Sequence, residues 1–152
     1  MRRAPTLLVI EDSADQAILV GLAARRAHPG LDVRNANNGL EGIAYLAGLA
    51  PFEDRKSHPL PNLIILDLVM PEVDGFEVLE WIKQQSDSVS PPVVVLTSST
   101  NPDDEARSLE LGAAAFYRKP TDLDRLGEVV SEIVQTCIRK SAMIGAHIWA
   151  AG

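Results

Sequence analysis

The sequence contains a single cysteine and no apolar run long enough to cross a membrane. Cys137 alone excludes an internal disulfide and a cysteine-rich zinc site, which fits a reducing compartment, and we interpret it as a packed helix residue. The apolar stretch after the charged residues 1–5 is short and ends at acidic residues, so we expect neither a signal peptide nor a transmembrane span. These absences favour a cytoplasmic protein with no membrane partner.

Basic residues are scarce as well. The chain has 14 lysine and arginine residues against 21 aspartate and glutamate residues, a net charge of −7, and it has no dense basic cluster. We therefore expect no binding to nucleic acid and look for partners among proteins. With 152 residues, the chain can bury a hydrophobic core as one domain without a metal or disulfide to support folding.

Short apolar runs alternate with segments of helical spacing along the chain. This alternation is typical of βα units that build a parallel sheet, so we predict an α/β fold. The expected strands are residues 6–10, 31–35, 62–67, 92–97 and 114–118, of which the second is short and polar, as suits a sheet edge. The expected helices are residues 13–27, a segment that begins at 38–39, residues 74–85, residues 102–111, and a last helix from 121–122 to at least 139.

The first helix should begin at Ser13, which is a good N-cap residue. Its spacing of apolar residues predicts an inner face of four side chains: Ile18, Leu19, Leu22 and Ala23.

Two stretches lie outside a minimal sheet of five βα units. Residues 48–61 form a long connection before the third strand, and loops of this length either contact a partner or extend into solvent. Residues beyond Arg139 form an apolar tail, which we expect to extend the last helix or to cover an apolar surface such as a dimer interface. We therefore divide the chain into a domain of residues 1–140 and a tail of residues 141–152.

Acidic residues directly follow two of the apolar strands. Asp67 comes after residues 63–66, and Glu11 and Asp12 come after residues 7–10. Open α/β sheets place their ligand sites at the carboxyl ends of strands, so neighbouring strands would bring the three carboxylates into one pocket. Such a cluster is costly unless a cation neutralises it, because like charges at close range raise one another's pKa values. A hard divalent cation, most simply Mg²⁺, would do so.

Polar residues also stand at the ends of the fourth and fifth strands. Thr97 follows Asp67 by 30 residues, and Lys119, which precedes Pro120, follows Thr97 by 22. Together with Glu11 and Asp12, these residues and spacings resemble the response-regulator receiver domains, the phospho-accepting modules of two-component signalling. The resemblance covers residues 5–138. It implies a doubly wound five-stranded parallel sheet with the flavodoxin-like order 2-1-3-4-5 and helices on both faces.

The resemblance implies that Asp67 accepts a phosphoryl group from a sensor histidine kinase. Asp12 and Asp67 would bind Mg²⁺ through their side chains, Val69 through its backbone carbonyl, and Glu11 through water. A protein of this kind signals by a conformational change through protein contacts. It is not an enzyme beyond its own phosphorylation and slow dephosphorylation.

Further residues have implied roles in the signal. Lys119 would pair with the aspartyl phosphate, and Thr97 would move toward the phosphoryl group and donate its hydroxyl to it. Phe116, three residues before Lys119, would reorient with Thr97 as part of the switch. The bond between Lys119 and Pro120 would be cis.

The chain departs from the family pattern near the expected phosphoryl group. Position 69, which is often polar in the family and flanks the path of attacking water, is a valine here. Ser99 is small and uncharged, so it cannot orient a water molecule as an acid or amide would. We therefore predict a long-lived phosphoryl state.

Two other interpretations of the same residues stay open. A strand-end acid is usually a helix cap or a loop residue, and a lone threonine or lysine is usually structural or exposed, so the joint occurrence is what favours a receiver. A pseudo-receiver would bind partners without phosphorylation. A haloacid-dehalogenase-type phosphohydrolase would need a second aspartate two residues after its nucleophile, where Val69 stands.

The chain ends soon after the last expected helix, so we expect no output domain and a signal passed on by protein contact. The long segment 48–61 and the motif at residues 96–99 resemble single-domain regulators that partner phytochrome-type histidine kinases. Regulators of that group tend to form homodimers, which the apolar tail would suit.

Overall fold

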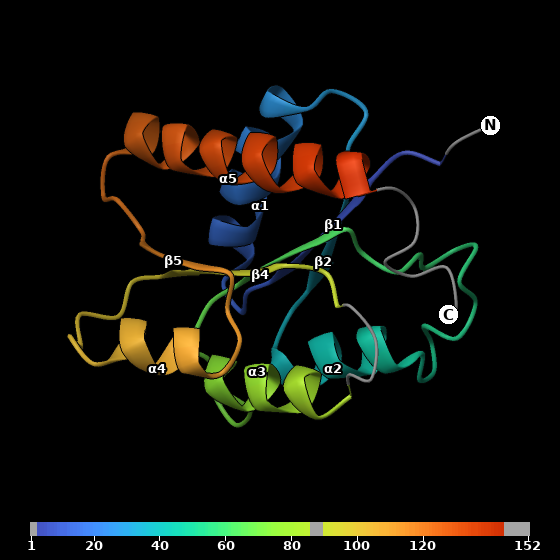
Figure 1. The fold of residues 1–152 in the computed structure, drawn as a ribbon, viewed down its shortest axis with the longest axis horizontal. Coiled ribbons are helices and arrows are strands. Elements are labelled where there is room, and N and C mark those ends of the chain that lie inside the picture. Colours follow the sequence, from blue (N-terminus) through green and yellow to red (C-terminus); the bar gives the residue numbers. More distant parts are fainter. Residues whose placement is uncertain (1–2, 86–89, 145–152) are drawn as a thin grey trace.

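The computed structural model describes residues 3–85 and 90–144, which form a sheet of five parallel strands covered by helices on both faces (Figure 1). The strand order β2-β1-β3-β4-β5 confirms the predicted order, with the polar β2 at an edge. The strands are β1 (Thr6–Ile10), β2 (Asp32–Ala36), β3 (Leu63–Leu66), β4 (Val93–Thr97) and β5 (Ala115–Arg118).

The helices form one layer on each side of the sheet. Helices α1 and α5 cover one face, and α2, α3 and α4 cover the other (Figure 1). The helices are α1 (Ala14–Ala27), α2 (Gly39–Ala47), α3 (Gly75–Gln84), α4 (Asp104–Glu110) and α5 (Leu123–Ile144). The predicted α/β fold with a doubly wound sheet is therefore confirmed.

Side-chain caps explain where α1 and α2 begin. The Ser13 hydroxyl accepts from the amide of Gln16 at 3.3 Å, as predicted for the start of α1. The Asn38 side chain accepts from Glu41 at 2.7 Å in the same way at α2. Each cap satisfies an amide that has no partner within its helix, which stabilises the helix end by about 1 kcal/mol.

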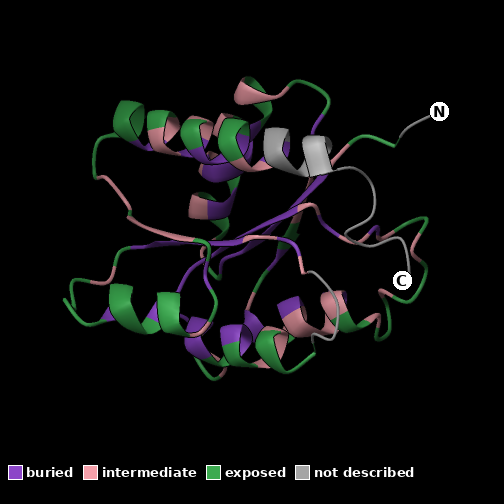
Figure 2. Ribbon diagram, viewed as in Figure 1, coloured by how far each residue is buried: buried purple, intermediate pink, exposed green. Residues whose placement is uncertain are grey.

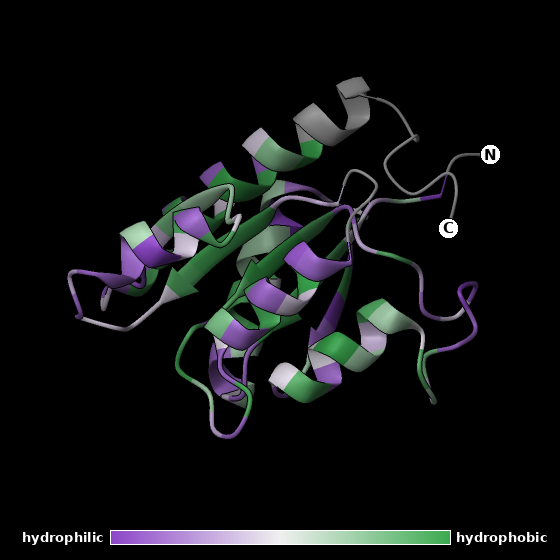
Figure 3. Cartoon of the chain, turned by 60° about the horizontal axis from the view of Figure 1, so that its bottom comes forward, coloured by the Kyte–Doolittle hydropathy of each residue, from purple (hydrophilic) through white to green (hydrophobic). Residues whose placement is uncertain are grey.

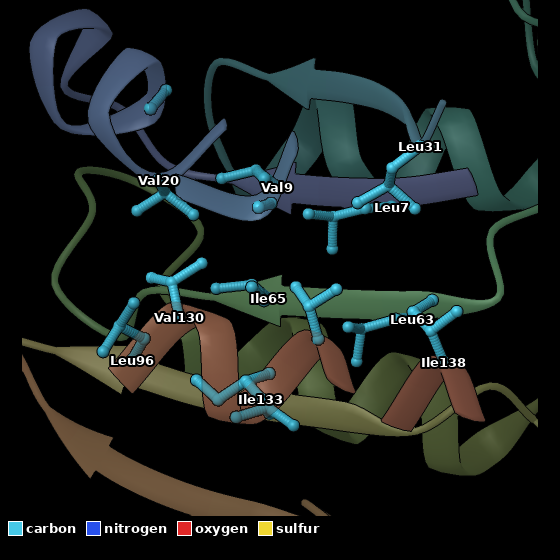
Figure 4. Packing of buried hydrophobic residues seen from close by; sticks show 14 of the residues in the cluster. Leu7, Val9, Val20, Leu31, Leu63, Ile65, Leu96, Val130, Ile133 and Ile138 are labelled. Atoms are coloured by element: carbon cyan, nitrogen blue, oxygen red, sulfur yellow. The ribbon is translucent and has the colours of Figure 1, made fainter. Parts of the chain in front are cut away.

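The sheet carries an apolar layer on each face. In β3, Leu63 and Ile65 belong to the layer with α1 and α5 (Figure 4). Ile64 and Leu66 belong to the layer with α2 and α3. Successive side chains of a strand point to opposite faces, so a central parallel strand is apolar throughout. Buried residues line the inner strands and the inner sides of the helices (Figure 2). The three central strands, β1, β3 and β4, are buried throughout and strongly hydrophobic (Figure 3).

Helix α1 turns a different face to the core from the predicted one. Leu19 and Ala23 pack against the core, but Ile18 and Leu22 are 59% and 54% exposed. The buried positions are Ala17, Val20, Gly21 and Ala24. Most of these are small, and small side chains let α1 approach the sheet and α5 closely, so the larger residues beside them are left on the outer surface.

Residues 48–61 pack against the end of α2 rather than extend into solvent. Arg55 donates to the carbonyl of Tyr45 at 2.8 Å, and the Tyr45 hydroxyl donates to the carbonyl of Pro59 at 2.8 Å. From the edge strand, Arg34 donates to the carbonyl of Ser57 at 2.8 Å. This segment is therefore part of the fold at the amino end of β3.

Helix α5 continues to Ile144, past the predicted boundary at residue 140. Residues 145–152, which include Ile148 and Trp149, lie outside the described residues, so the division at residue 140 and the role of the tail stay predictions. Within the part of the chain that the structure describes, no helix combines the length and apolar character that crossing a membrane requires.

Candidate functional site

Backbone hydrogen bonds align the strand ends that carry the predicted site residues. The amide of Asp67 donates to the carbonyl of Ile10 at 3.1 Å, which places Asp67 beside Glu11. The amide of Lys119 donates to the carbonyl of Thr97 at 2.8 Å, which joins the ends of β4 and β5. Because β3 lies between β1 and β4, these residues meet at one edge of the sheet.

Gly75 lets α3 begin directly over the end of β3. A Cβ atom at this position would lie 2.5 Å from the Asp67 carbonyl oxygen and 2.7 Å from the Leu68 Cα, so a larger residue would push the helix away. The Gly75 amide donates to the Leu68 carbonyl at 3.1 Å, and the Asp74 side chain caps the helix. The first contact therefore joins the loop after Asp67 to the start of α3, and the second fixes where α3 begins.

Glu11, Asp12 and Asp67 form a cluster of carboxylates. Each offers an oxygen, and these oxygens all lie within 4.8 Å of one another. Glu11 and Asp67 are 3% and 5% exposed, whereas Asp12 is exposed. Carboxylate oxygens grouped this closely, with Asp12 open to solvent, suit a hard divalent cation that keeps part of its water shell. The residues therefore fit the predicted metal site.

Val69 also contacts this cluster through its backbone. Its amide donates to Asp67 Oδ1 at 3.3 Å, while its side chain is 57% exposed. This hydrogen bond holds one carboxylate oxygen of Asp67 in a fixed direction. The role of the Val69 carbonyl as a metal ligand stays a prediction.

Lys119 supplies a positive charge next to the carboxylates. Its Nζ donates to Glu11 Oε1 and lies 3.3 Å from Asp67 Oδ2, and the side chain is 9% exposed. One ammonium group thus faces two buried carboxylates, with a third carboxylate nearby. The cluster keeps an excess of negative charge that a divalent cation would neutralise.

The pKa of Glu11 is raised from 4.5 to about 7, chiefly because burial disfavours its charged form. The hydrogen bond from Lys119 lowers this pKa, and the negative charge of Asp67 raises it. Without a metal ion, Glu11 therefore takes up a proton near neutral pH. A cation at the cluster favours the ionised carboxylate.

We expect the metal-free protein to lose stability between about pH 5 and about pH 8. A carboxyl group whose folded-state pKa is raised to about 7 stabilises the fold fully below its ordinary value of 4.5, and this contribution disappears as the pH rises through 7. With solvent screening at the mouth of the site, the loss should be about 1 to 2 kcal/mol. Urea unfolding in EDTA across this range measures it.

The variant Glu11→Gln is the control for this prediction, because glutamine has a similar shape and does not titrate. Its stability should change less with pH than that of the wild type. An equally steep loss in the variant would show that other groups cause the pH dependence.

The burial and contacts of Thr97 and Phe116, the two residues predicted to take part in the switch, are compatible with that role. Thr97 is fully buried, and its Oγ1 accepts from the Ser99 amide at 3.2 Å, which leaves the hydroxyl proton free to be donated elsewhere. Phe116 is half-buried on β5 and packs against the layer that contains α3. The movement of either residue stays a prediction.

The comparisons with known proteins agree with this geometry. Residues 7–131 match the family described as response regulator receiver domain. The chain belongs to this family. The receiver domain is 37% identical over 127 residues to "Response regulator Rcp1" from Synechocystis sp. (strain ATCC 27184 / PCC 6803 / Kazusa), and the match covers 84% of each chain.

Solved structures of receiver domains resemble this chain closely. The phosphorylated cyanobacterial phytochrome response regulator RcpA superposes with a TM-score of 0.81 at 30% identity, covering 89% of this chain and 94% of that one. The Mn²⁺-bound form of Rcp1 has a TM-score of 0.76 at 36% identity, covering 85% and 91%. These likenesses confirm the predicted resemblance to regulators associated with phytochromes.

The chain is therefore a response regulator of two-component signalling. Receiver domains bind a divalent metal at an acidic pocket, and Glu11, Asp12 and Asp67 form an acidic cluster that could hold such an ion. As a family, receiver domains are in general not enzymes.

The prediction of a cis bond between Lys119 and Pro120 is wrong. Within the described residues, the cis peptide bond is the one between Ala50 and Pro51. The prediction came from the family resemblance, and the trans form of an X-Pro bond is favoured by about 0.5 to 1 kcal/mol unless the surrounding structure opposes it.

Sequence reasoning missed two residues next to the site. Arg118 and Asp104 both hold the loop after Thr97, through Ser99. One signal was available, since Arg118 follows Phe116 by two residues and so lies on the same face of β5. The contact itself depends on the pairing of β4 with β5, which a single sequence does not reveal.

Proposed function

We propose that the chain accepts a phosphoryl group on Asp67 from a sensor histidine kinase and signals through protein contacts. The observation that carries this proposal is the combination of burial and neighbouring charges at the Asp67 carboxylate. It is buried, has Lys119 at 3.3 Å, and shares a pocket with the oxygens of Glu11 and Asp12. A buried carboxylate with charge-neutralising neighbours is what a phosphoryl acceptor requires.

In the transfer, a carboxylate oxygen of Asp67 forms a bond to phosphorus while the bond from phosphorus to the kinase histidine nitrogen breaks. The leaving nitrogen keeps the electron pair of that bond. Bound Mg²⁺, held by Asp12, Asp67 and the Val69 carbonyl and by Glu11 through water, would neutralise charge on the phosphoryl oxygens. Lys119 would pair with the new phosphate as a counter-charge. Thr97 would donate a hydrogen bond to this phosphate through its hydroxyl.

We infer that the kinase is of the phytochrome type. The names of the relatives support this, since RcpA is a phytochrome response regulator and a bacteriophytochrome response regulator matches at 31% identity with a TM-score of 0.68. We also propose that the protein works in the cytoplasm, where kinases obtain ATP, and forms a homodimer through its tail. Its net charge of −7 argues against nucleic acid as the target.

Acetyl phosphate with Mg²⁺, followed by intact-mass spectrometry, tests the central proposal. The wild type should gain the mass of one phosphoryl group, and EDTA should prevent the gain. An unmodified mass in the presence of Mg²⁺ would contradict the proposal and favour a pseudo-receiver. Continuous release of inorganic phosphate at enzymatic rates would favour a phosphohydrolase.

We propose that the phosphorylated state persists for minutes rather than seconds, with dephosphorylation as its only turnover. The Val69 side chain cannot orient water, and the Ser99 hydroxyl is engaged as a donor to Asp104. Removing acetyl phosphate and following the protein mass over time measures the lifetime. The variant Val69→Asn should shorten it, and a wild-type half-life of seconds at neutral pH would refute this expectation.

A further inference from the structure

Arg118 holds the loop between β4 and α4 in a defined place. Its guanidinium donates to the carbonyl of Ser99 and, at 3.2 Å, to the carbonyl of Asn101. It also lies over the Phe116 ring, with 5.2 Å between Cζ and the ring centroid. One side chain from β5 thus contacts two carbonyls of the loop and the aromatic residue beneath it.

Ser99 is fixed from a second direction by α4. Its hydroxyl donates to the carboxylate of Asp104, which is 8% exposed. Asp104 is held in turn, because the Ser108 hydroxyl donates to its backbone carbonyl at 2.7 Å. The position of Ser99 therefore follows from one contact with β5 and one with the start of α4.

The backbone amide of Ser99 connects the loop to Thr97 by a hydrogen bond. It donates to Thr97 Oγ1 at 3.2 Å, and this hydroxyl oxygen lies on a fully buried side chain. Because the oxygen already accepts the Ser99 N–H, the hydroxyl proton must point to another acceptor. A loop that moved away would release Thr97 to turn about its χ1 angle, as threonine can in a strand.

We propose that Arg118 is a positioning residue for the Thr97 hydroxyl, acting through Ser99. This rests on the proposed function, in which Thr97 donates to a phosphoryl group on Asp67. Arg118 itself does not reach the site, since its nitrogens end on loop carbonyls while the next residue, Lys119, contacts Glu11 and Asp67. A planar guanidinium can bridge two carbonyls at once, whereas a lysine can replace only part of this arrangement.

Binding of beryllium fluoride with Mg²⁺, a stable mimic of the phosphoryl group, tests this role. We expect Arg118→Ala to weaken binding by about three- to tenfold, because the variant loses the hydrogen bonds that order the loop. Arg118→Lys should recover part of the loss. The control Arg125→Ala removes another guanidinium, which is 69% exposed and whose ion pair with Glu128 is long, at 4.0 Å. This variant should bind beryllium fluoride as the wild type does.

A double-mutant cycle separates positioning from general support of the fold. In the background Thr97→Ala, the change Arg118→Ala should cause no further loss of affinity, because the hydroxyl that it positions is gone. An equal loss in both backgrounds, or a single variant that binds like the wild type, would overturn the role of Arg118. A wild type that binds no beryllium fluoride with Mg²⁺ would instead overturn the proposed function and this role with it.

Discussion

Asp67→Asn is expected to abolish phosphorylation by acetyl phosphate or by a kinase. The asparagine amide has no anionic oxygen to form the bond to phosphorus, and the change also removes one charge from the pocket shared with Glu11 and Asp12. Intact-mass spectrometry with Mg²⁺ should show no phosphoryl adduct on the variant. The fold should survive, because the substitution keeps the shape of the side chain and removes one of two buried carboxylates that repel each other.

Asp74→Asn is the matched control for this result. Asp74 lies seven residues further along, and its side chain accepts from the Glu77 amide at 2.9 Å, which asparagine can also do. This variant should be phosphorylated as fully as the wild type. Phosphorylation of Asp67→Asn, or its loss in Asp74→Asn, would show that another residue is the acceptor.

The position of Asp67 could be predicted because it depends on strong and local signals. Residues 63–66 are apolar without interruption, so they identify a buried parallel strand, and the residue after it must stand at the carboxyl edge of the sheet. Ser13 could likewise be predicted as a cap, since capping depends on the type of one residue and its nearest neighbours.

The parts that could not be predicted depend on contacts distant in sequence. Periodicity shows that α1 is amphipathic, but which of its neighbouring positions face the core depends on how closely α5 approaches, and this favours Gly21 over Leu22. The packing of residues 48–61 depends on Arg55 reaching the end of α2. The contact of Arg118 with Ser99 also joins residues on different strands and loops, which spacing alone does not connect.

Lys119→Met is expected to destabilise the metal-free protein by about 3 kcal/mol. The wild-type ammonium is 9% exposed and faces Glu11 and Asp67, so its removal leaves two buried carboxylates without a positive neighbour. The hydrogen bond from Lys119 also lowers the pKa of Glu11, and without it that pKa should rise further above 7. Urea unfolding in EDTA measures the loss of stability.

Mg²⁺ should reverse much of this loss, because a divalent cation replaces the missing positive charge at the same carboxylates. The difference in unfolding free energy between EDTA and Mg²⁺ should therefore be larger for Lys119→Met than for the wild type. Affinity for beryllium fluoride should nevertheless decrease by about 10- to 100-fold, since the counter-charge of the phosphoryl mimic is gone. The control Lys56→Met changes an exposed lysine of the loop and should alter neither quantity. A Lys119→Met protein as stable in EDTA as the wild type would mean that Lys119 does not balance the charge of the two carboxylates.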